Sequence, residues 1–344
     1  MTIRAVAAHA GVSRQTVSNA LNAPQRLTAP TLARVRAAID ELGYVPDEAA
    51  RALTSRRTRL IGIHIGPTAH SHASTPEPLL AEFVRAAARH GFRLVVLGSF
   101  GDDAGQIAAF DDVWRRRAVD GVILTDTHTD DARPAWLRER GVPFAAFGRP
   151  WGAPDSPHPW IDVDGHGGAW LAVDHLASSG HSRIAFLGWG HDEAGGDDRE
   201  RGWLEAMTTR GLDARPHAHA SGDTVVAGAE RAAELLERWR PTAVVCASDT
   251  LAAGVVRAAD RRGIAVGSDL AVTGYDDSPL ARLTHPELTS LTQPFAAVAD
   301  FLVDHVVMAS GIEVPDPPPR TRVAEPTLVV RGSTGGVRAG ALSF

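Results

Sequence analysis

Apolar residues recur at helical spacing in three short stretches near the start of the chain, at residues 3–10, 14–22 and 29–42. In each stretch the apolar side chains stand three or four positions apart, so that they fall on one face of a helix. Thr2 and Ser13 precede the first two stretches and are residue types that cap helices. The pattern therefore predicts a small unit of three amphipathic helices.

Three residues of this unit, Ala7, Gly11 and Val17, stand at the spacing of a helix-turn-helix. A small side chain such as Ala7 lets two helices cross closely, and Gly11 tolerates the positive φ that the turn requires. Val17 then anchors the second helix against the first. A helix-turn-helix presents the outer face of its second helix to the major groove of DNA, although a small helical bundle with a polar face has a similar pattern.

The residues on that outer face are types that contact DNA. Arg14 can pair with the edge of guanine, and Gln15 and Asn19 with the edge of adenine. Thr16 and Ser18 suit contacts with a phosphate or a thymine methyl group. We therefore expect the second helix to read base pairs.

A short segment after the third helix has the features of a helix that forms only when something supports it. Pro46 ends the preceding pattern, and Asp47 can cap a new helix of about two turns. Isolated helices of fewer than about 12 residues are marginal in water. We expect this segment to fold against a partner helix or DNA and to act as a switch.

From residue 60 onward, apolar runs alternate with amphipathic helical patterns. The runs cover residues 60–65, 94–97, 121–124, 144–147, 184–188, 243–247 and 271–274. The helical patterns cover residues 78–90, 106–116, 166–179, 199–210, 225–238, 250–262 and 295–309. Strands that alternate with helices form parallel sheets with helices on both faces, so the fold class is an all-α head followed by an α/β body.

Ligands of open parallel sheets bind at the carboxyl ends of the strands. The residues at these ends include carboxylates, an arginine and aromatic side chains: Thr125, Asp126, Phe147, Arg149, Gly188, Trp189, Ser248, Asp249, Asp276 and Asp277. Charged groups can bind hydroxyls in pairs, and a flat ring can cover the apolar face of a sugar. This set favours a polyhydroxylated ligand.

The chain is long enough for more than one domain, and its charge is divided unevenly. All 35 basic residues among its 344 are arginines, which excludes a Schiff-base lysine and the lysine of a phosphate-binding P-loop. Residues 1–59 hold nine arginines against four acidic residues, a net charge of +5, which leaves −11 for the remainder because the total is −6. A basic head on an acidic body is typical of a nucleic-acid-binding unit joined to another domain.

The opening residues lack the apolar core of a secretory signal, and no apolar stretch approaches the roughly 18 residues of a membrane span. Cys246 is the single cysteine, so neither an intramolecular disulfide nor a multi-cysteine zinc site can form. We therefore expect a cytoplasmic protein that does not bind a membrane.

Three weaker signals do not indicate further chemistry. Residues 165–168 (Gly-His-Gly-Gly) lack the third glycine of a dinucleotide-binding loop. His70, His72, His217 and His219 have no carboxylate at metal-binding spacing. No acid–base pair or nucleophile motif is visible, so we expect no enzyme activity, no cofactor and no metal.

Several segments together resemble the LacI/GalR family of bacterial repressors, and the resemblance covers most of the chain. The matching segments are TIRAVAAHAGVSRQTVSNALN, ELGYVPDEAARAL, DVDGHGGAWLAVDHLASSGHSRIAFLG, CASDTLAAGVVRAADRRGIAVGSDLAVTGYDDSPLARLTHPELTSLTQP and PTLVVRGST. The resemblance implies a helix-turn-helix head, a hinge helix and a core like that of periplasmic sugar-binding proteins, with two doubly wound parallel-sheet subdomains.

The resemblance also implies where the parts of the chain begin and end. A DNA-binding domain covers residues 1–45, a hinge 46–58, an effector-binding core 59–332 and a tail 333–344. Crossovers near Ile161, Gln293 and Val323 divide the core into an N-subdomain (59–161 and 293–322) and a C-subdomain (162–292 and 323–332). Because the tail has no leucine heptad, we expect a homodimer without a coiled-coil tetramerisation segment.

Position by position, the resemblance assigns Arg14, Gln15 and Asn19 to base reading. It assigns Leu53 to a wedge that kinks the minor groove at the operator centre, whereas the residues by themselves favour plain helix packing for Leu53. The expected DNA contacts are Thr2, Ser13, Arg14, Gln15, Thr16, Ser18, Asn19, Asn22, Tyr44, Ala50 and Leu53.

In the body, Arg199 and Asp276 match effector contacts of the family. The expected effector contacts are Asp126, Phe147, Arg149, Trp189, Arg199, Ser248, Asp249, Asp276, Gln293 and Phe295. An aspartate at the end of a strand can equally cap the next helix, so each of these carboxylates has a structural alternative.

The expected function is a homodimeric transcriptional regulator, a repressor of palindromic double-stranded operator DNA. A small effector, a sugar or sugar derivative, changes the angle between the subdomains and thereby the state of the hinge helices. The alternative is a solute-binding protein for a transporter. That class shares the body but requires a signal peptide and has no basic head.

Overall fold

The computed structural model describes residues 2–45, 57–64, 77–98, 101–189 and 194–335. The chain divides into two compact units, Met1–Thr58 and Arg59–Phe344. Residues 46–56, which include the expected hinge helix with Ala50 and Leu53, lie outside the described residues, as do residues 336–344 of the tail.

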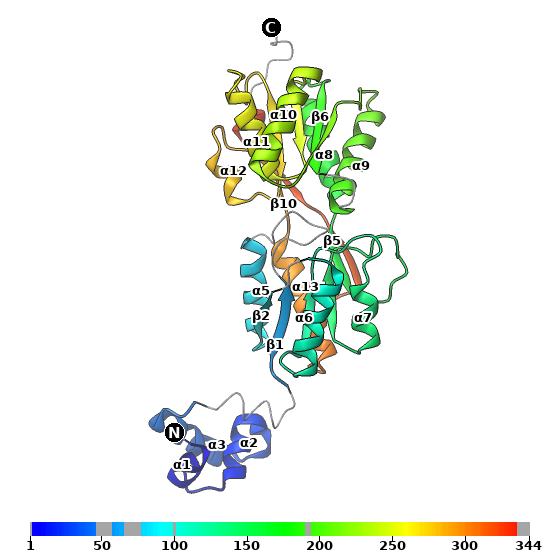
Figure 1. Cartoon of the computed structure of the whole chain (residues 1–344). Helices are drawn as coiled ribbons and strands as arrows, with labels where there is room; N and C mark the ends of the chain where they lie inside the picture. Colours follow the sequence, from blue (N-terminus) through cyan, green and yellow to red (C-terminus); the bar gives the residue numbers. More distant parts are fainter. Residues whose placement is uncertain (1, 46–56, 65–76, 99–100, 190–193, 336–344) are drawn as a thin grey trace. The chain divides into compact units, whose positions relative to one another are not determined.

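The first unit is a small helical domain with three α-helices among its described residues (Figure 1). They are α1 (Ile3–His9), α2 (Arg14–Asn22) and α3 (Ala29–Leu42), with a 3-10 turn, η1 (Pro24–Arg26), before α3. The hydroxyl of Thr2 accepts a hydrogen bond from the Ala5 amide at 3.3 Å, and the hydroxyl of Ser13 accepts one from the Thr16 amide at 3.0 Å. The three predicted helices and both predicted caps are confirmed.

The core of this unit forms where the helices cross. Ala7 and Val17 are buried together with Val35 of α3, and Gly11 lies in the left-handed region with φ 65°. The small side chain at the crossing and the glycine in the turn are the features that the spacing predicted. The first unit is a helix-turn-helix.

The second unit contains two sheets of six strands each. The first sheet is formed by β1 (Leu60–His64), β2 (Arg93–Leu97), β3 (Gly121–Leu124), β4 (Phe144–Phe147), β5 (Trp160–Val163) and β11 (Thr321–Ala324). Its strand order is β11-β5-β4-β3-β1-β2, and every pair is parallel.

Helices cover both faces of this sheet. They are α5 (Glu77–Arg89), α6 (Asp103–Arg115), α7 (Arg133–Glu139) and α13 (Phe295–Ala309) (Figure 1). Alternate residues of β3 point to opposite faces: Ile123 packs in the cluster of α5 and α13, whereas Val122 and Leu124 pack with side chains of α6 and α7. The layered arrangement is the one that the alternating pattern predicted.

The second sheet is formed by β6 (Ile184–Trp189), β7 (His217–Ala220), β8 (Ala243–Cys246), β9 (Ala271–Tyr275), β10 (Thr289–Thr292) and β12 (Thr327–Val329). Its order is β12-β10-β9-β8-β6-β7, with β12 antiparallel to β10. Its helices are α8 (Gly165–Ser178), α9 (Ala194–Thr209), α10 (Val225–Trp239), α11 (Asp249–Asp260) and the short α12 (Pro279–Leu283), and a 3-10 turn, η2 (Gly332–Thr334), comes after β12. α8 packs on α9, and α10 packs on α11.

All seven apolar runs are strands, but the pattern did not single out five further strands, namely β5, β7, β10, β11 and β12. The strand β7 has the sequence HAHA, which contains no apolar run. Such a sequence is tolerated because β7 lies at the edge of the sheet, where it pairs with β6. The chain leaves the first sheet after Val163 and again after Ala324, so the expected crossovers at Ile161 and Val323 fall inside β5 and β11. No helix among the described residues is long and apolar enough to span a membrane.

Candidate DNA-reading face and effector site

The outer face of α2 carries the side chains expected to read DNA. Arg14 and Gln15 are exposed, while Thr16, Ser18 and Asn19 are half-buried. The Nε2 of Gln15 donates to Oδ1 of Asn19 at 3.1 Å, one helical turn away. This hydrogen bond holds the Asn19 amide in one orientation, and an oriented amide is what the paired contact with an adenine edge requires.

The other expected DNA contacts have different surroundings. Thr2 and Ser13 are exposed cap residues, and the Ser13 hydroxyl also lies 2.9 Å from that of Thr16. Tyr44 is half-buried and packs against the head core. The side chain of Asn22, like residues Ala50 and Leu53, lies outside what the structure describes.

We expect Asn19→Ala to weaken binding at one base pair of each half-site by about 1–3 kcal/mol, because the paired contact with that base is lost. Fluorescence anisotropy with single-base operator variants measures this, and Asn19→Ala should bind all variants of that base pair equally. Arg4→Ala, an exposed change on α1, serves as the control. Equal weakening on every sequence would show that Asn19 contacts the backbone instead.

In the body, Arg199 of α9 lies between two aromatic rings. Its guanidinium carbon is 3.7 Å from the ring centre of Tyr275 and 5.6 Å from that of Trp189. The guanidinium also donates to the carbonyl oxygen of Ala247, just after β8, and lies 3.9 Å from Oδ1 of Asp276. Arg199 therefore lies at the carboxyl ends of β6, β8 and β9 together.

Asp276 follows β9 and adopts a positive φ of 100°, which is unusual for a residue with a side chain. Its Oδ1 accepts a hydrogen bond from Nε2 of Gln293, a buried residue just after β10. Burial raises the pKa of Asp276, and the charge of Arg199 and the Gln293 hydrogen bond oppose that rise. The sheet thus places Asp276, Arg199 and Gln293 together, as expected.

Two buried polar groups beside Arg199 have no hydrogen-bond partner among the described residues. They are the indole Nε1 of Trp189 and the hydroxyl of Tyr275, whose side chains are 6% and 2% exposed. A buried donor without a partner costs about 1–3 kcal/mol, so these two polar groups are unusual in a protein interior. Tyr275 was not among the expected contacts, although its position directly before Asp276 is a signal that could have identified it.

Ser248 and Asp249 both make hydrogen bonds inside the protein. Ser248 caps α11 by accepting from the Leu251 amide at 3.1 Å. Asp249 is 1% exposed and accepts hydrogen bonds from the Ser290 hydroxyl and the Ser278 amide, both at 2.6 Å. Burial raises the pKa of Asp249 to about 7, and the charge of Asp276 adds to the rise. Of the two alternatives for such strand-end residues, these contacts support the structural one.

Arg149, which follows β4, connects the two sheets of the body. Its Nε lies 2.6 Å from Asp162 of β5, and its Nη2 lies 3.4 Å from Asp198 of α9. Burial lowers the pKa of Arg149, but the charges of Asp162 and Asp198 outweigh this and raise it overall. The guanidinium also stacks over Trp151, 4.8 Å from its ring centre. Asp162, Asp198 and Trp151 carry no signal in the sequence, because their roles depend on contacts across the fold.

The remaining expected contacts come from the first sheet. Asp126 follows β3, is half-buried and has a positive φ of 55°. Phe147 is partly buried at the end of β4, and Phe295 is buried at the start of α13, both against the same core. The structure therefore places both aromatic side chains in the core of the first sheet.

A helix-turn-helix joined to a two-sheet body with a polar strand-end site defines a class of ligand-responsive DNA-binding proteins. Residues 2–47 match the family described as "Bacterial regulatory proteins, lacI family", and residues 173–334 match the "Periplasmic binding protein-like domain".

Similar proteins extend over nearly the whole chain. The transcriptional regulator CelR of Thermobifida fusca is 35% identical over 89% of this chain and 92% of its own. The ribose operon repressor of Escherichia coli K12 is 31% identical over 96% of this chain and 99% of its own. The chain therefore belongs to the lacI family and is a DNA-binding transcriptional regulator.

Two solved structures are also similar. A complex of the regulator CelR with cellobiose has a TM-score of 0.69 and 30% identity, covering 97% of this chain and 99% of its own. A lac repressor dimer bound to operator and an anti-inducer has a TM-score of 0.80 and 26% identity, with the same coverage.

Proposed function

We propose that this chain is a homodimeric repressor whose two heads bind the half-sites of a palindromic operator, and that a sugar bound at the Arg199 site releases it. The observation that carries the sugar site is the cluster of Arg199, Asp276 and Gln293 beside the aromatic rings of Trp189 and Tyr275. Aromatic faces beside charged hydrogen-bonding groups suit a polyhydroxylated ring.

The proposed effector is a disaccharide of the cellobiose type. CelR, whose complex with cellobiose is similar in structure, supports this choice. Trp151 and Trp189 flank the two arginines of the site, Arg149 and Arg199, so a ligand that reaches both arginines would meet two indole rings. A ligand of two linked rings suits that arrangement better than a single ring does.

We assign each proposed function to a separate part of the chain. Residues 1–45 bind DNA, residues 46–58 form the hinge, and residues 59–332 bind the effector, with Asp126, Phe147, Arg149 and Phe295 contributed by the first sheet. The protein acts in the cytoplasm, where its operator lies, and it catalyses no reaction. The basic head argues against the alternative of a transporter's solute-binding protein.

The test combines two measurements. Selection from randomised palindromic duplexes identifies the operator, and calorimetric titration with cellobiose, galactose and ribose identifies the sugar. We expect one preferred duplex, whose affinity falls when cellobiose is added. The proposal is wrong if no duplex is preferred over random competitor with or without these sugars.

We expect Asp198→Asn to weaken cellobiose binding by roughly fivefold, because a partly buried ion pair contributes about 1 kcal/mol. Among the described residues, Arg149 then keeps its ion pair with Asp162, which belongs to its own sheet, and the ionic contact with α9 is lost. Calorimetry measures the affinity, with Asp174→Asn as the matched control because Asp174 pairs with Arg210 within the second subdomain. Identical affinities for Asp198→Asn and wild type would mean that the contact between the sheets does not assist binding.

A further inference from the structure

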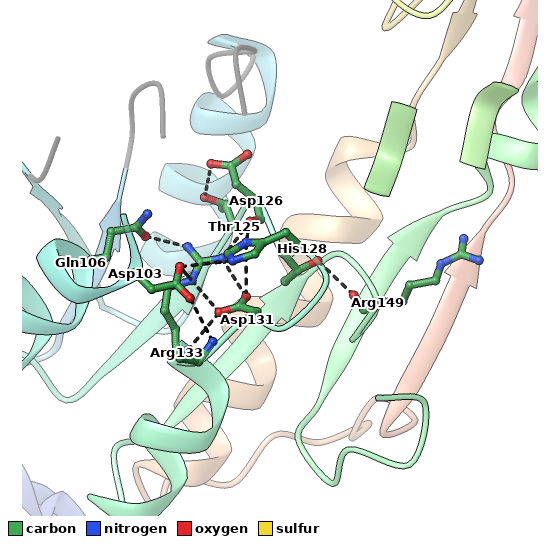
Figure 2. A network of polar contacts seen from close by, with 10 residues as sticks. Asp103, Gln106, Thr125, Asp126, His128, Asp131, Arg133 and Arg149 are labelled. Carbon is green, nitrogen blue, oxygen red and sulfur yellow. Dashed lines mark hydrogen bonds and ion pairs between the residues drawn. The ribbon is translucent and has the colours of Figure 1, made fainter. Parts of the chain in front are cut away.

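We propose that a buried network centred on Arg133 positions the effector contacts Asp126 and Arg149, which follow β3 and β4. Figure 2 shows this network, which connects side chains of α6, of the loop after β3 and of α7. The positioning role rests on the proposed assignment of Asp126 and Arg149 to the sugar site. The other residues of the network are proposed to hold these two in place without contacting the sugar.

Arg133 is an unusual residue to find in a protein interior, because it is 1% exposed. Its guanidinium forms a paired contact with Asp131, with Nε 2.9 Å from Oδ1 and Nη2 2.8 Å from Oδ2. Nη1 donates to Oε1 of the buried Gln106 at 2.6 Å. A buried arginine with fork-like pairing has one favourable position, so it is a rigid anchor for whatever else it contacts.

The further contact of Arg133 is with the backbone of Asp126. Nη2 of Arg133 donates to the Asp126 carbonyl oxygen at 2.8 Å, and Nδ1 of His128 lies 3.2 Å from the same oxygen. The positive φ of 55° at Asp126 costs free energy for a residue with a side chain. The two contacts hold the peptide plane in that conformation, and the Asp126 carboxylate itself accepts a hydrogen bond from the Thr125 hydroxyl at 3.3 Å.

A second bond ties this loop to the loop of Arg149. The Thr127 hydroxyl donates to the carbonyl oxygen of Arg149 at 3.0 Å. The approach is possible only because residue 148 is glycine: a Cβ there would lie 2.1 Å from Oγ1 of Thr127. The backbone of Gly148 also has a φ of 108°, which excludes other residues. Gly148 thus permits the hydrogen bond between the Thr127 hydroxyl and the Arg149 carbonyl oxygen.

The consequence is that Asp126 and Arg149 are held at a fixed separation before the sugar arrives. A site whose loops are already ordered does not lose their conformational entropy on binding, so its affinity is higher. Loss of the Thr127 bond should leave the fold intact and release the Arg149 loop. The network is thus a positioning device rather than a stabilising one.

The same network includes Asp103, His128 and Asp131, whose ligand atoms lie close enough to hold a metal ion. Arg133 already supplies a positive charge there, since Nε lies 3.5 Å from Asp103 and Nη2 contacts Asp131. A cation placed beside a buried guanidinium would be repelled. The surroundings therefore favour the positioning role over a metal site.

The decisive variant is Thr127→Val, which keeps the shape of the side chain and removes its hydroxyl. The probe is whichever of cellobiose, galactose and ribose wild type binds most tightly. We expect the Kd for that sugar to rise about threefold to tenfold, as for the loss of one hydrogen bond, with Tm within about 2 °C of wild type. Deuterium exchange at residues 147–151 should become faster in the sugar-free protein. Thr284→Val, which removes a hydroxyl bonded to the Pro286 carbonyl in the second subdomain, is the control. It should change neither the Kd for the sugar nor the exchange at residues 147–151.

Arg133→Lys is the second variant, because lysine keeps the charge but not the fork. It should accelerate exchange at residues 125–133 as well. Unchanged exchange in both loops of Thr127→Val overturns the positioning role, whether or not a sugar binds. If exchange accelerates but the Kd stays unchanged, the loops are tied for stability alone and the proposal is also wrong. Asp126→Ala and Arg149→Met test the sugar-site assignment separately from the positioning role. Normal sugar affinity in both variants would refute the assignment of Asp126 and Arg149 to the sugar site.

Discussion

Replacement of Arg199 by methionine should abolish the response to sugar while the protein still binds its operator. The guanidinium lies over the ring of Tyr275 and is 3.9 Å from Asp276. Hydrogen bonds to a charged group contribute about 1.5–3 kcal/mol, so we expect the Kd for cellobiose to rise by about 100-fold. Methionine fills most of the space between the two rings, so the loss reports the charge rather than the packing.

Arg210→Met is the matched control for this experiment. Arg210 follows the other end of α9, stacks over Trp170 at 5.3 Å and pairs with Asp174, away from the strand ends. It should titrate like wild type in calorimetry, and both variants should bind the operator without sugar within about twofold of wild type, because neither change touches the head. A normal cellobiose titration of Arg199→Met would remove Arg199 from the binding site.

The second large effect is expected for Gly202→Ala, at the crossing of α8 and α9. A Cβ on Gly202 would lie 2.1 Å from the carbonyl oxygen of His166 and 2.7 Å from its Cα. These are backbone atoms, which no rotamer change can move aside. Overpacking of this kind costs about 3 kcal/mol or more, so the Tm of the body should fall by about 6 °C or more.

Gly98→Ala is the control, because a Cβ at Gly98 would meet no atom of the described residues within 4 Å. Calorimetric scanning of the two variants and wild type measures the difference. We also expect Gly202→Ala to lose cellobiose affinity, because Asp198 and Arg199 stand on the same helix and move with it. A Tm equal to that of Gly98→Ala would mean that the two helices separate without cost.

The head could be predicted almost completely from its residues. Its caps at Thr2 and Ser13 act within three residues, and its turn requires only that Gly11 accept a positive φ. Interactions between near neighbours in the chain can be predicted from the spacing of the residues. The central strands of the body can also be predicted, because a strand buried on both faces must be apolar along its length.

Much less of the effector site could be predicted. The carboxylates Asp249 and Asp276 both follow buried strands, and their places in the strand pattern do not distinguish them, although the family resemblance matches Asp276 to an effector contact. The fold separates them because Ser290, 41 residues away, satisfies Asp249 inside the protein, whereas Asp276 faces Arg199. The partner of Arg149 on α9, Asp198, is 49 residues distant and no motif marks it.

By itself, the order of residues determined a DNA-reading head, a layered α/β body and the edge of the sheets where we expect a ligand to bind. These follow from helical spacing, strand alternation and the charge on each part, all of which act locally. Only the tertiary structure decided which of the polar groups at that edge satisfy one another and which remain available. That choice depends on distances between segments far apart in the chain, and a buried charge or donor is stable only when a partner lies within hydrogen-bond reach.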